Sequence, residues 1–145
     1  MRSGAEVRKD PVGFARIQWD TWSPPGWFDK TEFAATSESF LGPDWVDITL
    51  NAYRARWMSG EVTDARYDAL QRKLGGIERL STSTLMIQGA SDFCDAPKES
   101  EGLDNFFTGR YQRLLLDGVG DFPHREAPKR VADVLRRFQG TMTIQ

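Results

Sequence analysis

The chain has 145 residues, of which 39% are hydrophobic and 28% are charged, and its formal net charge is −2. This length and composition are typical of one globular domain, and the scattered basic residues argue against nucleic acid or an anionic membrane as a partner. The longest apolar runs, such as Leu114–Leu116, fall far short of the ~20 residues of a membrane helix, and the N-terminal residues lack a signal peptide's apolar stretch. The single cysteine, Cys94, excludes an internal disulfide. We therefore expect a soluble, cytoplasmic protein.

The first part of the chain is rich in aromatic residues and is expected to be helical. All five tryptophans lie within the first 57 residues. Pro24-Pro25-Gly26 predicts a turn between two aromatic pieces, and Pro43 is placed to open a helix that runs through Trp57 and stops at Gly60. The helical spacing predicts a broad apolar stripe made of Trp45, Ile48, Thr49, Ala52 and Tyr53, with Val46, Leu50 and Trp57 adjoining.

A change of composition divides the chain near Gly75-Gly76. A second, more polar helix is expected from about Asp64 to Leu74, and the two glycines end it. The chain then becomes richer in Leu, Val and Gly and contains no further tryptophan. We therefore divide it into an aromatic-rich helical cap segment, residues 1–76, and a C-terminal α/β segment, residues 77–145.

The C-terminal segment alternates between strand and helix patterns. Thr84–Gly89 and Leu114–Leu116 are short, nearly continuous apolar runs, typical of strands that are buried on both faces. Pro97 predicts the start of a helix that reaches Phe107, and Pro128 predicts the start of the last helix. This order predicts an α/β fold with two parallel strands joined by a right-handed crossover. Because two strands alone leave both edges unpaired, we expect the end of a larger sheet.

Two loops that follow these strands carry the residues suited to chemistry. Open α/β sheets place functional groups at the carboxyl ends of their strands. The first loop, residues 89–95, contains Asp92, and the second, residues 118–128, contains His124, which is the only histidine. An acid that accepts the imidazole Nδ1–H, and a histidine whose Nε2 takes the proton of a nucleophile, are what Ser-His-Asp chemistry requires.

The motifs in these loops resemble those of a known family. The strand followed by Gly-x-x-Asp, then Gly-x-Gly-x-Phe-x-x-x-Glu-x-Pro and a terminal helix, resemble the C-terminal half of an α/β-hydrolase-fold enzyme, and the aromatic helices resemble its cap. The resemblance spans about Pro11 to Phe138. It implies a partial α/β-hydrolase fold, no cofactor, and Asp92 as the triad acid. The intact relative would cleave an ester or a similar bond in a small, fairly apolar molecule.

Two departures from the family pattern predict that the chain is inactive alone. The family's histidine directly follows the second glycine of the last loop, where this chain has Asp121. The nucleophile elbow Gly-x-Ser-x-Gly and the central strands that carry it do not occur in this sequence. The chain therefore resembles a truncated hydrolase that has a cap and the last two strands but no nucleophile.

Neither His124 nor Asp121 replaces the missing base easily. His124 lies three residues beyond the expected position, and a displacement of several Å breaks a hydrogen bond that needs ~2.6–3.2 Å. It is a weak candidate base, and an exposed histidine at a helix start is the simpler interpretation. Asp121 can transfer a proton near neutral pH only if its pKa rises strongly from ~3.9, and it would repel Asp92 where the loops meet.

Several of these residues also have ordinary structural interpretations. Asp92 could instead cap its own turn, and Cys94 is expected to be a small, partly buried residue without special reactivity. The nearby carboxylates are expected to serve as caps and turns rather than as a metal site. Four aromatic residues could line an apolar substrate pocket or simply pack in the core: Trp22, Trp27, Phe28 and Trp57.

Two non-catalytic functions remain open beside the truncated hydrolase. The incomplete sheet could pair with another chain, which would be either a second copy or a separate N-terminal half, because an unpaired strand edge favours association. Alternatively, the aromatic cap could bind a small apolar molecule without turning it over.

Overall fold

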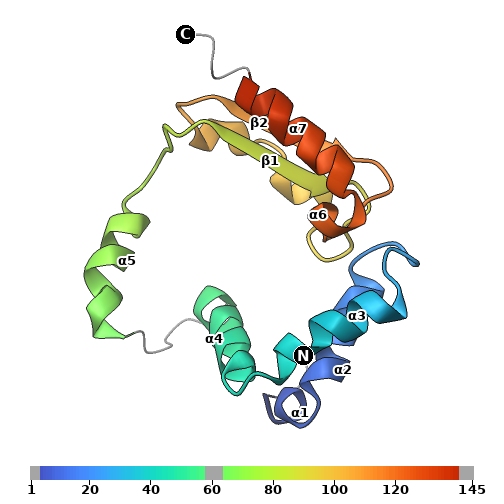
Figure 1. Cartoon of the computed structure of the whole chain (residues 1–145). Coiled ribbons are helices and arrows are strands. Elements are labelled where there is room, and N and C mark those ends of the chain that lie inside the picture. Colours follow the sequence, from blue (N-terminus) through green and yellow to red (C-terminus); the bar gives the residue numbers. More distant parts are fainter. Residues whose placement is uncertain (1–3, 58–63, 141–145) are drawn as a thin grey trace. The chain divides into compact units, whose positions relative to one another are not determined.

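The computed structural model describes residues 4–57 and 64–140, and Figure 1 shows their secondary structure. These residues form two compact units. The first unit comprises residues up to Gln18 together with Asp29–Ile77, and the second comprises Trp19–Phe28 together with the residues from Glu78 onward. The assignment of Trp19–Phe28 to the second unit was not predicted from the sequence. It places three of the tryptophans in the same unit as the two strands.

The first unit is helical. Its buried side chains include Val7, Ala15, Phe33 and Val46. Asp29 caps α3 because its Oδ1 accepts the backbone N–H of Glu32 at 2.8 Å. The α-helices of this part of the chain are α1 Gly4–Lys9, α2 Pro11–Thr21, which continues into the second unit, α3 Lys30–Ser37, α4 Trp45–Trp57 and α5 Asp68–Gly75. Two 3₁₀ turns lie between them, Glu38–Leu41 and Ala65–Tyr67.

The structure corrects the predicted apolar stripe of α4. The helix begins at Trp45 rather than at Pro43, and its predicted stop at Gly60 lies outside the described residues. Ile48 is 67% exposed, whereas Val46 is buried. Of the other predicted residues, Ala52 is exposed, whereas Trp45, Thr49, Leu50 and Tyr53 are half-buried, so the stripe is correct in part and its most buried residue is Val46. A broad stripe does not determine which of its edges is buried.

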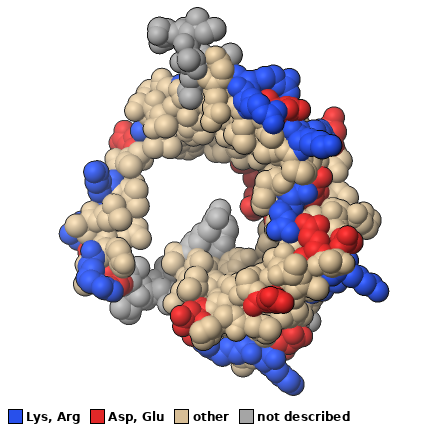
Figure 2. All heavy atoms as spheres, in the orientation of Figure 1, with Lys and Arg blue, Asp and Glu red and all other residues tan. Residues whose placement is uncertain are grey.

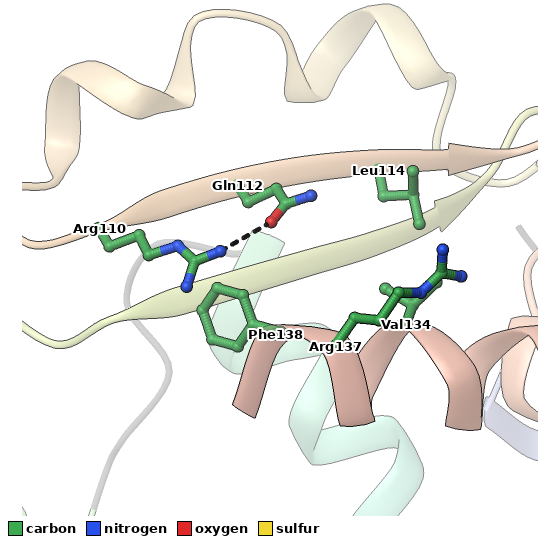
Figure 3. A pocket seen from close by; sticks show the side chains of 6 residues that line it. All are labelled: Arg110, Gln112, Leu114, Val134, Arg137 and Phe138. Carbon is green, nitrogen blue, oxygen red and sulfur yellow. Dashed lines mark hydrogen bonds between the residues drawn. The ribbon is translucent and has the colours of Figure 1, made fainter. Parts of the chain in front are cut away.

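The second unit contains the predicted pair of parallel strands. Strand β1, Thr84–Gly89, pairs in register with β2, Tyr111–Leu116, from Thr84 opposite Tyr111 to Gly89 opposite Leu116. Two helices follow, α6 Pro123–Glu126 and α7 Pro128–Gly140. Figure 3 shows α7 on one face of the strands and the crossover segment on the other. The predicted α/β fold class is therefore confirmed, as is the last helix that starts at Pro128.

The predicted crossover helix from Pro97 to Phe107 is wrong. Its place is taken by two 3₁₀ turns, η3 Pro97–Ser100 and η4 Leu103–Phe106, which are separated by Gly102 at φ +74°. Ser100 is buried and donates a 2.6 Å hydrogen bond to Gln88 of β1, while Arg113 of β2 donates one of 2.7 Å to Ser100. Both strands thus hold the first turn against the sheet, and the left-handed glycine prevents a continuous helix.

A groove of about 240 Å³ opens between β2 and α7 (Figure 3). The Arg110 guanidinium lies 4.4 Å from the centre of the Phe138 ring and donates to the Gln112 side chain at 3.4 Å. Because Arg110 directly precedes β2, this end of the groove lies at the amino end of the strand, away from the loops at the carboxyl ends. The groove is lined by Arg110, Gln112, Leu114, Val134, Arg137 and Phe138.

The surface of the described part carries both signs of charge. Figure 2 shows basic and acidic side chains interspersed on the face in view. Among the helices within residues 4–57 and 64–140, none has the length and apolar character required to cross a membrane.

Gly89 permits the close approach on which the carboxyl end of the sheet depends. A Cβ atom at this position would lie 2.2 Å from the carbonyl oxygens of both Val119 and Gly120, which are backbone atoms that cannot rotate away. We predict that Gly89→Ala lowers the free energy of unfolding by about 1–3 kcal/mol. Gly140→Ala is the matched control, because a Cβ at Gly140 meets no atom within 4 Å. Urea unfolding of both variants checks this, and equal stabilities would contradict the close approach.

Candidate functional site

The loops that follow β1 and β2 are joined by backbone hydrogen bonds. The N–H of Ala90 donates to the Leu116 carbonyl at 3.0 Å, and the N–H of Ser91 donates to the Val119 carbonyl at 2.8 Å. Two consecutive N–H groups beyond the end of β1 therefore hold the first loop against the end of β2 and the second loop. The structure brings together the two predicted loops at the carboxyl end of the sheet.

Asp92 is almost fully buried at the start of the first loop. Its Oδ1 accepts the backbone N–H groups of Cys94 and Asp95, both at 2.9 Å, which forms the turn-capping arrangement that the sequence left open. Oδ2 has no hydrogen-bond partner among the described residues, so the same carboxylate keeps one oxygen for a second donor. Cys94, expected to be partly buried, is exposed.

Asp121 occupies the position where the family resemblance expects histidine. Burial is the largest cause of a rise in the pKa of Asp121 from its usual 3.8 to about 6. The negative charges of Asp92, Asp95 and Glu126 raise it further. The predicted repulsion between Asp92 and Asp121 is thus present, and the Asp121 carboxyl is partly protonated near neutral pH.

His124 does not join this group of side chains. It is the second residue of α6 and is exposed, and it forms no hydrogen bond or ion pair with any residue that the structure describes. The hypothesis that His124 acts as a displaced base therefore stays a prediction, and its exposed position does not favour it.

An aromatic cluster, defined as Trp19, Trp22, Trp27, Phe28 and Phe122, packs beside Asp121. The Phe122 ring centre lies 5.0 Å from that of Trp27 and 6.3 Å from that of Trp22, and both pairs are stacked. Trp19 is buried and contacts Trp27 at 4.7 Å, whereas Trp22, Trp27 and Phe28 are half-buried. Two of the predicted lining residues, Trp22 and Trp27, therefore contact the second loop, and Phe28 packs on Trp19 and Trp27. The side chain of the fourth predicted residue, Trp57, lies outside the described part.

Sequence reasoning missed two polar residues of the site, Ser23 and Glu126. Glu126 Oε1 accepts the Ser23 hydroxyl at 2.7 Å and the N–H of Phe122 at 2.9 Å, and its Oε2 accepts the N–H of Gly120 at 2.6 Å. Ser23 is 2% exposed, and its Oγ also accepts the N–H of Asp121 at 3.0 Å. Glu126 belongs to the Glu-x-Pro motif that carried the family resemblance, whereas nothing in the sequence singles out Ser23.

The site offers no arrangement suited to a metal ion. In the described ranges, no three or more His, Cys, Asp and Glu side chains form a group that could hold one. The carboxylates instead accept backbone hydrogen bonds, as at Asp92 and Glu126, or sit close to like charges, as at Asp121.

The fold is similar to that of a solved hydrolase structure. No family model matches the sequence, and no curated protein matches it. The crystal structure of "a putative epoxide hydrolase" from Klebsiella pneumoniae subsp. pneumoniae matches with a TM-score of 0.83 and 28% sequence identity. The match covers 93% of this chain and 44% of the Klebsiella chain, so this chain spans less than half the length of that protein. The chain has a partial hydrolase-like α/β fold.

The raised pKa of Asp121 predicts a pH-dependent stability. Since the folded state holds this proton more tightly than the unfolded state, its contribution to stability falls as the pH rises from about 4 to about 6 and is constant above. In Asp121→Asn this loss of stability with rising pH does not occur, because asparagine does not titrate. We expect the variant to match the wild type near pH 4 and to exceed it by about 1 kcal/mol at pH 7.5, allowing for solvent screening.

Urea unfolding at several pH values between these limits measures the difference. Asp117→Asn is the control because Asp117 is exposed and lies in the turn directly after β2. A difference between Asp121→Asn and the wild type that does not change with pH would show that Asp121 titrates normally.

Proposed function

We propose that this chain is a hydrolase-like module whose intact relatives open an epoxide, or cleave an ester, of a small apolar molecule. The observation that supports this is the fold similarity to the Klebsiella structure, which extends over nearly all of this chain. The aromatic cluster beside the second loop suits an apolar substrate, because ligand pockets are lined mainly by apolar and aromatic side chains. By the family resemblance, Asp92 would be the acid that orients a histidine in such an enzyme.

We propose further that this chain is catalytically silent by itself. Asp92 needs an N–H donor that can also take a proton from a nucleophile. The Asp121 carboxyl offers only an O–H, and only while it is protonated, and the charges of the two carboxylates oppose each other. A pKa of about 6 would let Asp121 transfer protons, but opening an epoxide or an ester also requires a nucleophile at carbon. The sequence has no Gly-x-Ser-x-Gly elbow to supply one.

Activity assays test the silent state directly. Wild type, Asp121→His and Asp92→Asn are each incubated with styrene oxide and with p-nitrophenyl butyrate. We expect all three to match the rate in buffer, because restoring a base does not supply the nucleophile. A burst of p-nitrophenol, or turnover that Asp92→Asn abolishes, would contradict the proposal and place a complete catalytic group within these residues.

A second function is favoured by the outer edge of β1. In the described sheet β1 pairs only with β2. The N–H groups of Thr84 and Ala90 donate to the carbonyls of Arg110 and Leu116, so the even-numbered residues face β2. Leu85 and Ile87 therefore direct their backbone groups to the outer edge. We propose that this edge pairs with a second copy of the chain.

Light scattering at increasing protein concentration tests this association. We expect the mean mass of the wild type to rise with concentration and the mean mass of Leu85→Pro to stay at the value of a monomer. Proline at position 85 removes an outward N–H without removing a hydrogen bond between β1 and β2. A near-UV circular dichroism spectrum like that of the wild type serves as the control for folding. A wild type that stays monomeric over the whole range would exclude pairing with a second copy.

A further inference from the structure

We propose that Ser23 and Glu126 form a latch that positions residue 121 against Asp92. This inference rests on the proposed function only in that position 121 is the one where a hydrolase of this fold would carry its base. Ser23 and Glu126 are positioning residues, since neither is required to touch a substrate. The latch acts on the backbone of the second loop and is independent of the side chain at 121.

Three consecutive amides of the second loop are held by this one pair of side chains. The N–H groups of Gly120 and Phe122 donate to the two oxygens of Glu126, and the N–H between them, that of Asp121, donates to Ser23 Oγ. The Ser23 hydroxyl donates in turn to Glu126. Hydrogen bonds to a carboxylate are stronger than neutral ones, and three fixed peptide planes determine where the Cβ of residue 121 points.

Close packing makes the latch specific. Ser23 is 2% exposed, and a Cβ atom at Gly120 would lie 2.4 Å from Ser23 Oγ and 2.5 Å from its Cα. Only glycine lets the loop reach the serine. The neighbouring residue, Trp22, accepts the N–H of Phe93 from the first loop at 3.1 Å. Trp22 and Ser23 therefore bridge the two loops, which holds Asp92 and residue 121 in one arrangement.

Electrostatics opposes the arrangement that the latch maintains. The charges of Asp92, Asp95 and Glu126 all disfavour an ionised Asp121. A loop without restraint would move Asp121 toward water, where its carboxylate is solvated and the repulsion is screened. The latch prevents this movement, although one of its own members, Glu126, adds to the unfavourable charge. Glu126 is useful there because a carboxylate can accept three donors at once.

Ser23→Ala tests the latch because it removes a hydroxyl without changing any charge. We expect amide hydrogen exchange at residues 120–122 to accelerate about fivefold to tenfold, and the pKa of Asp121, followed by NMR of its carboxyl carbon, to fall toward its usual range. Asp95→Asn is the matched control. It removes one of the charges near Asp121 but no member of the latch, so the pKa should fall while exchange at residues 120–122 stays unchanged.

A second pair of variants tests the positioning itself. In Asp121→His, the latch should hold the new imidazole beside Asp92, whose negative charge raises the pKa of that imidazole. Adding Ser23→Ala, or Glu126→Gln if that variant folds better, should lower the pKa of the imidazole at position 121. The same imidazole pKa with and without the latch residues would overturn the latch. None of these readouts needs turnover, so failure of the hydrolase proposal is measured separately.

Discussion

The close approach of three backbone segments at the carboxyl end of the sheet is the constraint on which the site depends. A Cβ atom at Gly89 would overlap the carbonyls of Val119 and Gly120, and one at Gly120 would overlap Ser23. A side chain at either glycine would separate the segments by more than a hydrogen bond tolerates. The burial of Asp92 and Ser23 follows from this contact. So does the position of Asp121 among like charges.

This constraint explains how the like charges of Asp92 and Asp121 can lie near each other at the carboxyl end of the sheet. The loops are brought together by glycines, backbone hydrogen bonds and Glu126, none of which involves the side chain at position 121. The unfavourable charge of Asp121 is relieved instead by its raised pKa, which lets it carry a proton at mildly acid pH. The fold similarity to the Klebsiella structure and an aspartate at position 121 are therefore compatible.

The elements that could be predicted from the sequence are those set by local pattern. The apolar runs at Thr84–Gly89 and Leu114–Leu116 and the proline at 128 correctly predict β1, the second half of β2 and the start of α7. The predicted crossover helix was wrong because a buried hydrogen bond from Ser100 to Gln88 holds this segment in a 3₁₀ turn against the sheet. The partners in the latch lie 103 residues apart, and no periodicity records a contact across that distance. Glu126 could be identified from the Glu-x-Pro motif, but the three groups that donate hydrogen bonds to it could not be predicted.

Because the side chains of the latch bind backbone amides, the conformation of the second loop does not depend on the side chain at position 121. Were the loop held by its catalytic side chain, replacing that side chain would release the loop and expose the aromatic cluster to water. Because Ser23 and Glu126 bind the amides of residues 120–122, the side chain at 121 can change while the stacking of Phe122 on Trp22 and Trp27 persists. The hydrophobic contacts and the loop then stabilise each other whether or not a base is present. The second loop can therefore keep its conformation whichever side chain stands at position 121.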